Sequence, residues 1–227
     1  MADMGTTTTT TDEKALVRLI AWLSPAFPVG SFAYSGGLER AVHDRIVTDA
    51  AELTDWLATL LDHGAWRNDA ILLARAWQAS SAELACLAEL AEALAGSAER
   101  YLETMLLGAA FLEAAAAWGD EGDDGALPTL AYPLAVGRIA RRHGVPLQPT
   151  LVAWLHALVS QAISAAIRLS VIGQRQGVTL LAEMEERIIE AAGRAAAATL
   201  DDLGSATILG EIVAMRHETQ HSRLFRS

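Results

Sequence analysis

The pattern His-Glu-x-x-His occupies residues 217–221, close to the end of the chain. On a helix, this spacing places two imidazoles on one face to bind zinc, with a glutamate beside them as a general base. A catalytic zinc needs a third protein ligand, and residues 222–227 contain no His, Cys, Asp or Glu, so an upstream residue such as Glu190 would have to supply it. Zinc-dependent hydrolysis therefore stays open as an alternative function, with His217 and His221 as weak candidate metal ligands.

A second pattern, Ala33-Tyr34-Ser35-Gly36-Gly37, lies one residue away from the G-x-S-x-G elbow of serine hydrolases. That elbow needs a strand before the serine and a sheet around it. The sequence predicts helices instead, so Ser35 is better interpreted as a turn or cap residue. We expect no catalytic residues and no enzyme.

The charge of the chain excludes several other functions. The formal net charge is −11, and Lys14 is the only lysine among 17 basic residues. An acidic chain without a basic run fits poorly against a phosphate backbone, so we expect no binding to nucleic acid. Because Lys14 does not follow a glycine, the chain also lacks a G-x-x-x-x-G-K-[ST] loop for nucleotides.

The cellular location follows from cysteine usage and from the apolar stretches. Cys86 is the only cysteine, so an internal disulfide is impossible, which favours a reducing compartment, the cytoplasm. Residues 1–12 lack the basic and apolar regions of a secretory signal and are predicted to form a disordered lead. The longest apolar stretch, residues 151–172, is interrupted by polar and charged residues, so we expect no membrane span.

Helical periodicity dominates the chain, and alternating strands bounded by hairpin turns are missing from the sequence. Thr10 and Glu13 form a capping box before a helical apolar face that begins at Leu16. Further helices are predicted near residues 51–63, 66–79, 82–95, 98–118, 132–143, 150–172, 178–200 and 206–221. We therefore predict an all-α protein, a single-domain bundle of about nine or ten helices, with the domain over 13–221 and a tail over 222–227.

Two segments depart from the helical pattern. Residues 24–39 contain Pro25, Pro28 and several glycines, and they predict a shaped apolar loop that leads into a helix near Gly37. Residues 119–128 are acidic and predict a surface linker, because their spacing lacks the ligand pattern of a calcium loop.

The predicted helix 150–172 is apolar on nearly all sides, which indicates a central position. Its polar residues recur every four positions and so share one face. That face contacts water or a neighbouring helix, or else it lines a water-filled channel. The candidates for a channel wall are His156, Ser160, Gln161 and Ser164.

Four stretches of the chain are recognisable together. They read LSPAFPVGSFAYSGGLE over residues 23–39, AYPLAVGRIARRHGV over 131–145, SAAIRLSVIGQRQG over 164–177 and VAMRHETQHSRLFRS over 213–227. In order and rough spacing they resemble the urease accessory protein UreF family, over nearly all of the chain from about Leu16.

The resemblance implies an all-helical, dimeric, cytosolic protein without catalytic activity. It implies binding to a second accessory protein, UreD (also called UreH), and recruitment of the nickel-carrying GTPase UreG to urease apoprotein for insertion of nickel. A water-filled tunnel and control of the GTPase cycle are further implications. The high apolar fraction, 52%, agrees with burial against partners or in a dimer.

The resemblance also implies which residues contact partners. The tail combines forked guanidinium donors with apolar anchors, which suits binding to carboxylates on another protein. The candidate partner-binding residues are Phe27, Phe32, Tyr34, Ser35, Arg168, Gly173, Gln174, Arg216, His217, Glu218, Arg223, Leu224, Phe225 and Arg226.

The chain departs from the family pattern at several positions. His221 stands where tyrosine is usual, so the zinc-like spacing is interpreted as incidental. Gly36 stands where histidine is frequent, so no metal or partner role of that imidazole carries over. A nickel ion held between His217 and His221 is a further interpretation, but two ligands are too few for a closed site. We therefore predict no resident metal and no cofactor.

Overall fold

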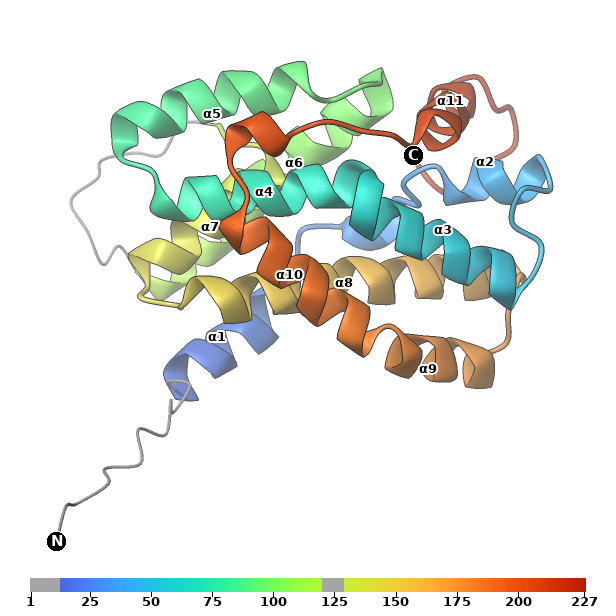
Figure 1. Ribbon diagram of the computed structural model, residues 1–227, viewed down its shortest axis with the longest axis horizontal. Helices are drawn as coiled ribbons and strands as arrows, with labels where there is room; N and C mark the ends of the chain where they lie inside the picture. Colours follow the sequence, from blue (N-terminus) through green and yellow to red (C-terminus); the bar gives the residue numbers. More distant parts are fainter. Residues whose placement is uncertain (1–12, 120–128) are drawn as a thin grey trace, which may run out of the picture.

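The computed structural model describes residues 13–119 and 129–227, and every regular element within them is helical (Figure 1). The elements are α1 (Glu13–Trp22), η1 (Ser31–Ala33), α2 (Leu38–His43), α3 (Ala50–His63), α4 (Ala65–Gln78), α5 (Ser81–Ala93), α6 (Ala98–Ala115), η2 (Ala116–Trp118), α7 (Tyr132–Arg142), α8 (Leu147–Arg168), α9 (Gln174–Glu183), α10 (Glu185–Ala197), η3 (Leu200–Asp202) and α11 (Ile208–His217). The all-α, single-domain prediction is confirmed. The predicted lead with Thr10 and nearly all of the acidic linker lie outside the described residues.

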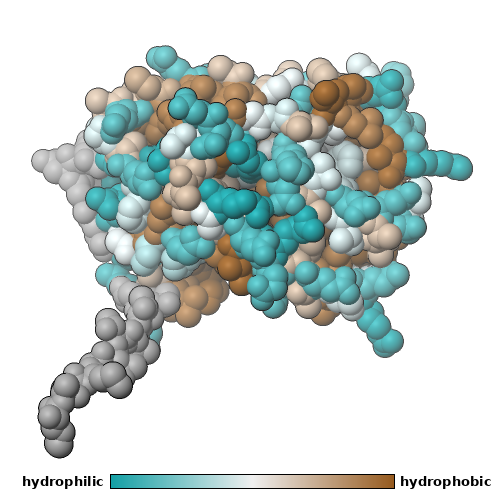
Figure 2. Space-filling view, in the orientation of Figure 1, coloured by the Kyte–Doolittle hydropathy of each residue, from teal (hydrophilic) through white to brown (hydrophobic). Residues whose placement is uncertain are grey.

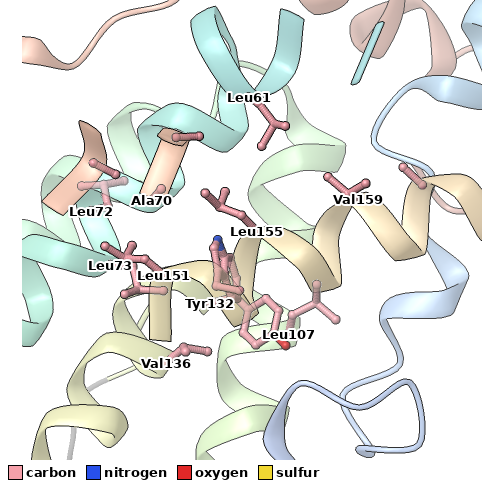
Figure 3. Packing of buried hydrophobic residues seen from close by; sticks show 14 of the residues in the cluster. Leu61, Ala70, Leu72, Leu73, Leu107, Tyr132, Val136, Leu151, Leu155 and Val159 are labelled. Carbon is pink, nitrogen blue, oxygen red and sulfur yellow. The ribbon is translucent and has the colours of Figure 1, made fainter. Parts of the chain in front are cut away.

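Helix α8 is central, as its sequence predicted, because α1, α2, α3, α4, α7, α9 and α10 all pack against it. Figure 3 shows its Leu151 beside Leu73 of α4 and its Leu155 beneath Leu61 of α3; all four side chains are buried. Each such side chain contributes about 1.5–3 kcal/mol by leaving water. The core therefore forms around α8, from residues far apart in the sequence.

Helix α8 also has the length and hydropathy of a membrane span, and it is the one such helix in the described ranges. Half of its most apolar stretch is buried within the protein. Its apolar character is thus accounted for by its position in the core.

The structure corrects three predicted helix boundaries. The stretch 178–200 is two helices, α9 and α10, which meet at the buried Met184, and the change of direction there lets both pack against α8. Helix α8 ends at Arg168, because Ser170 adopts the left-handed conformation with φ 62°. The last helix ends at His217 rather than at residue 221.

Helices α4 and α7 approach each other most closely at Gly137 of α7. A β-carbon added to Gly137 would lie 2.4 Å from the carbonyl oxygen of Leu73. This is well inside van der Waals contact, so the missing side chain is what permits the approach.

We expect Gly137→Ala to lower the free energy of unfolding by about 1–3 kcal/mol, because the backbone of α4 must move away. Gly193→Ala on α10 is the matched control, since a β-carbon there meets nothing within 4 Å. That change should stabilise the protein by up to about 1 kcal/mol through helix propensity. Urea denaturation monitored by circular dichroism measures both, and equal effects would contradict the packing argument.

Candidate functional site

The C-terminal segment, residues 218–227, folds back from the end of α11 and lies against α2 and the loop before it (Figure 1). The backbone N–H of Arg226 donates to the carbonyl of Ala33 at 2.7 Å. The N–H of Ser35 donates to the carbonyl of Ser227 at 2.8 Å, and the Ser35 hydroxyl donates to the same oxygen. The first and last stretches of the family resemblance therefore meet in space.

Glu39 is the residue on which the segment is seated. It lies buried in the first turn of α2. That helix begins directly after Gly37, whose φ of 84° turns the chain sharply into it. The Oε1 of Glu39 accepts the N–H of Leu224 at 2.7 Å, and its Oε2 accepts the N–H of Phe225 at 3.0 Å. Hydrogen bonds to a carboxylate contribute about 1.5–3 kcal/mol each, so this side chain is a strong anchor for the segment.

His217 joins Glu39 to a second carboxylate. Its side chain is 0% exposed, with Nε2 3.1 Å from Oε2 of Glu39 and Nδ1 2.7 Å from Oε2 of Glu99. Each ring nitrogen thus lies within hydrogen-bond distance of a carboxylate oxygen. Arg223 completes the network, with Nη1 2.5 Å from Oε1 of Glu99. The two carboxylates are thereby joined through one imidazole and one guanidinium.

The geometry contradicts the use of His217 and His221 as a zinc pair. Helix α11 ends at His217, so His221 is exposed in the non-helical segment and the two imidazoles do not share a helical face. Both nitrogens of His217 already have carboxylate partners. In the described part of the chain, no three His, Cys, Asp or Glu residues are grouped to hold a metal ion.

Glu218, the carboxylate of the His-Glu-x-x-His pattern, has a structural role instead. Its Oε1 accepts the N–H of Ala98 at 2.9 Å and that of Glu99 at 3.4 Å, at the start of α6. These N–H groups have no partner within the helix, so Glu218 caps α6 from a distant part of the chain.

Polar residues of α8 hold the other side of the site. The guanidinium of Arg168 lies 4.2 Å from the ring centroid of the buried Phe225, and its Nη1 donates to the carbonyl of Phe32 at 2.7 Å. The amide of Gln161 donates to the carbonyls of Ser31 at 2.6 Å and Tyr34 at 3.2 Å. The polar face of α8 therefore fixes the loop around η1.

A cavity of about 350 Å³ lies next to the segment. Gln161, Tyr34, Ser35 and Ser227 contribute to its wall, together with side chains from α3, α4 and α6. Of the four channel candidates, only Gln161 lines this cavity; His156 and Ser164 are exposed and Ser160 is half-buried. The channel stays a prediction.

Asp69, Arg100 and Glu103 form a cluster in the wall of the cavity. Arg100 pairs with Asp69 and lies 3.6 Å from Glu103, which also accepts the hydroxyl of Ser227 at 3.1 Å. Burial raises the pKa of Asp69 and of Glu103. The guanidinium of Arg100 lowers both pKa values, but by less than burial raises them. Burial alone would lower the pKa of Arg100, but the two carboxylates together raise it, so the guanidinium stays charged.

The predicted partner-binding residues divide into four sets. Phe27 is a core residue, whose ring lies 5.6 Å from that of Phe111. Tyr34 is likewise buried, and its carbonyl accepts the amide of Gln161. The exposed N-terminal turn of α9 contains Gly173 next to Gln174, and α9 packs against α8, α10 and α3. The residues that hold the C-terminal segment in place are Ser35, Arg168, His217, Glu218 and Phe225. The residues whose side chains face solvent near it are Phe32, Arg216, Arg223, Leu224 and Arg226.

Sequence reasoning missed Glu39 and Glu99. They lie 178 and 118 positions from His217, so no spacing pattern joins them to it. A glutamate two residues after a double glycine, in a loop otherwise free of charge, was the one available signal for Glu39.

Comparisons with known proteins agree with this structural picture. A family model described as UreF matches residues 47–185. The chain is 60% identical to the urease accessory protein UreF of Rhizobium etli, over 94% of this chain and 97% of that protein. It is 58% identical to the urease accessory protein UreF of Agrobacterium fabrum, over 94% of this chain and 96% of the relative.

The chain belongs to the UreF family of urease accessory proteins. A further member, urease accessory protein UreF 1 of Brucella canis, is 55% identical over 94% of each chain. The resemblance drawn from the four sequence stretches is confirmed, and so is the accessory role that it implied. The comparisons lend no support to zinc-dependent hydrolysis.

The cavity carboxyls give a pH dependence with a defined sign. The folded protein keeps protons on Asp69 and Glu103 at a pH where the unfolded chain has released them. Their stabilising contribution is therefore present below the unfolded pKa and is lost as the pH rises through the folded pKa. Relative to Asp69→Asn, the free energy of unfolding of the unmodified protein should fall as the pH rises above about 4, the ordinary pKa of an aspartate.

Asp202→Asn is the control of opposite sign. The N–H of Thr199 holds the pKa of Asp202 below its ordinary value, so that carboxylate stabilises at high pH and less as the pH falls. Urea denaturation over a pH series measures both differences. A difference for Asp69→Asn that rises with pH would contradict the burial argument.

Proposed function

We propose that this protein is a non-enzymatic scaffold of urease maturation. It joins the accessory protein UreD (UreH) and the GTPase UreG on urease apoprotein, so that nickel is inserted there. Nickel is then the cargo of the assembly and not a resident cofactor. The observation that supports this proposal best is the outward face of the C-terminal segment.

That face has the composition of a protein-binding surface. Leu224 is 65% exposed, and the exposed Arg223 and Arg226 flank it and Phe225 in the sequence. Guanidinium groups around an apolar anchor are frequent at interface hot spots. The surface is also pre-organised, because Glu39 holds the backbone of Leu224 and Phe225 and Glu99 holds the guanidinium of Arg223.

Other exposed apolar residues support further protein contacts, including a homodimer. Helix α11 presents Ile208, Leu209, Ile212 and Met215 to solvent, and Figure 2 shows brown surface over this helix. Helix α1 presents Leu16, Val17 and Ile20. Apolar side chains of this size in groups are typical of surfaces that bind another protein.

The location proposed for this work is the cytoplasm. Cys86 is a free thiol on the surface, which agrees with a reducing compartment. Passage of nickel through the chain and control of the GTPase cycle stay predictions.

We expect Leu224→Ala combined with Arg226→Ala to weaken binding to UreD and UreG by about 30-fold or more, because hot-spot truncation costs about 2 kcal/mol. Copurification from cells that express all components, followed by a measured Kd, tests this. The paired change Ile189→Ala and Arg187→Ala is the control, since it removes an exposed apolar residue and an arginine from α10. Undiminished copurification of both partners would contradict the proposed binding face.

A further inference from the structure

Glu39 combines three features that distinguish it from other acidic residues near the C-terminal segment. It is buried, it accepts two consecutive backbone N–H groups, and it faces the imidazole of His217. Backbone N–H groups are the same whatever the side chain, so Glu39 fixes the backbone path at Leu224 and Phe225 and does not select their side chains.

We propose that Glu39 is the positioning residue of the C-terminal segment. It selects the conformation in which Leu224, Arg223 and Arg226 face outward and Ser227 closes one wall of the cavity. The inference deepens the proposed function, and it rests on that function only where it concerns partner binding.

Two other contacts of the segment are weak or depend on this conformation. The pair between Arg223 and Glu99 is partly exposed to solvent, and exposed ion pairs contribute little, about 0–1 kcal/mol. Ser227 reaches Ser35 and Glu103 only when the preceding backbone runs along α2.

His217 makes release of the segment physically accessible. Its imidazole belongs to α11, not to the segment, and it stays beside Glu39 when the segment leaves. The Glu39 carboxylate would then lose two N–H donors but keep its contact with Nε2 of His217, so it would not be left without a hydrogen-bond partner. Two discrete states, seated and released, follow from this arrangement.

The test is Glu39→Gln, studied in the full-length protein. The amide has the same shape, but it has no charge and one of its two polar atoms is a donor. That donor would face an N–H of the segment or the ring of His217. We expect hydrogen exchange at the amides of Leu224 and Phe225 to rise about tenfold or more, while the amides of α8 stay protected.

Glu52→Gln is the matched control. Glu52 lies in the first turn of α3, and its carboxylate accepts the N–H and the hydroxyl of Thr48 at 2.7 Å, away from the segment. This change should leave exchange at Leu224 and Phe225 unaltered. Unchanged protection of these two amides in Glu39→Gln would overturn the proposal.

A second variant covers the case in which Glu39→Gln loses the native helical signal. Glu39→Asp keeps a carboxylate for His217 but is one methylene shorter, so it withdraws from the N–H groups of the segment. The same selective rise in exchange is expected, and full protection of the segment in this variant overturns the proposal.

Copurification of UreD and UreG separates this inference from the proposed function. If Glu39→Gln releases the segment and both partners still bind, the positioning role stands and the segment is not the partner site. If the segment stays protected while Leu224→Ala with Arg226→Ala abolishes binding, the partner site stands and Glu39 does not position it.

Discussion

A buried carboxylate must be neutralised and hydrogen-bonded, and the site depends on how Glu39 meets this requirement. The imidazole of His217 contacts one carboxylate oxygen, and two backbone N–H groups of the C-terminal segment donate to the carboxylate as well. The first turn of α2, the end of α11 and the final residues of the chain are thereby held together. The outward face of the segment is held in place because the backbone N–H groups on its inner side are hydrogen-bonded in this way.

The same requirement explains why the zinc-like pattern is not a metal site. His217 is buried between Glu39 and Glu99, and Glu218 turns to the N-terminus of α6. His217 and Glu218 each fasten one element to another. A metal ion on His217 would compete with the contacts that its two ring nitrogens make to the carboxylates. This use of the pattern agrees with membership of a family of accessory proteins.

The fold was largely predictable because helical periodicity is a local property. The apolar spacing placed helices near 51–63, 66–79, 98–118 and 132–143, and the structure has α3, α4, α6 and α7 there. The prediction was wrong where packing decided the outcome. The apolar periodicity of 178–200 is continuous and gives no sign of the turn at Met184, which follows from packing against α8. The pattern at 217–221 does not contain the end of α11, which is set by the partners of His217.

By itself, the amino-acid sequence determined the all-helical class, the central position of α8 and the family, because these follow from periodicity, composition and a series of local stretches. It also marked the C-terminal residues as important. Only the tertiary structure decided which of them face inward and which outward. The physical reason is that Glu39, Glu99 and His217 are far apart along the chain, and burial of their charges is favourable only once folding has brought all three together.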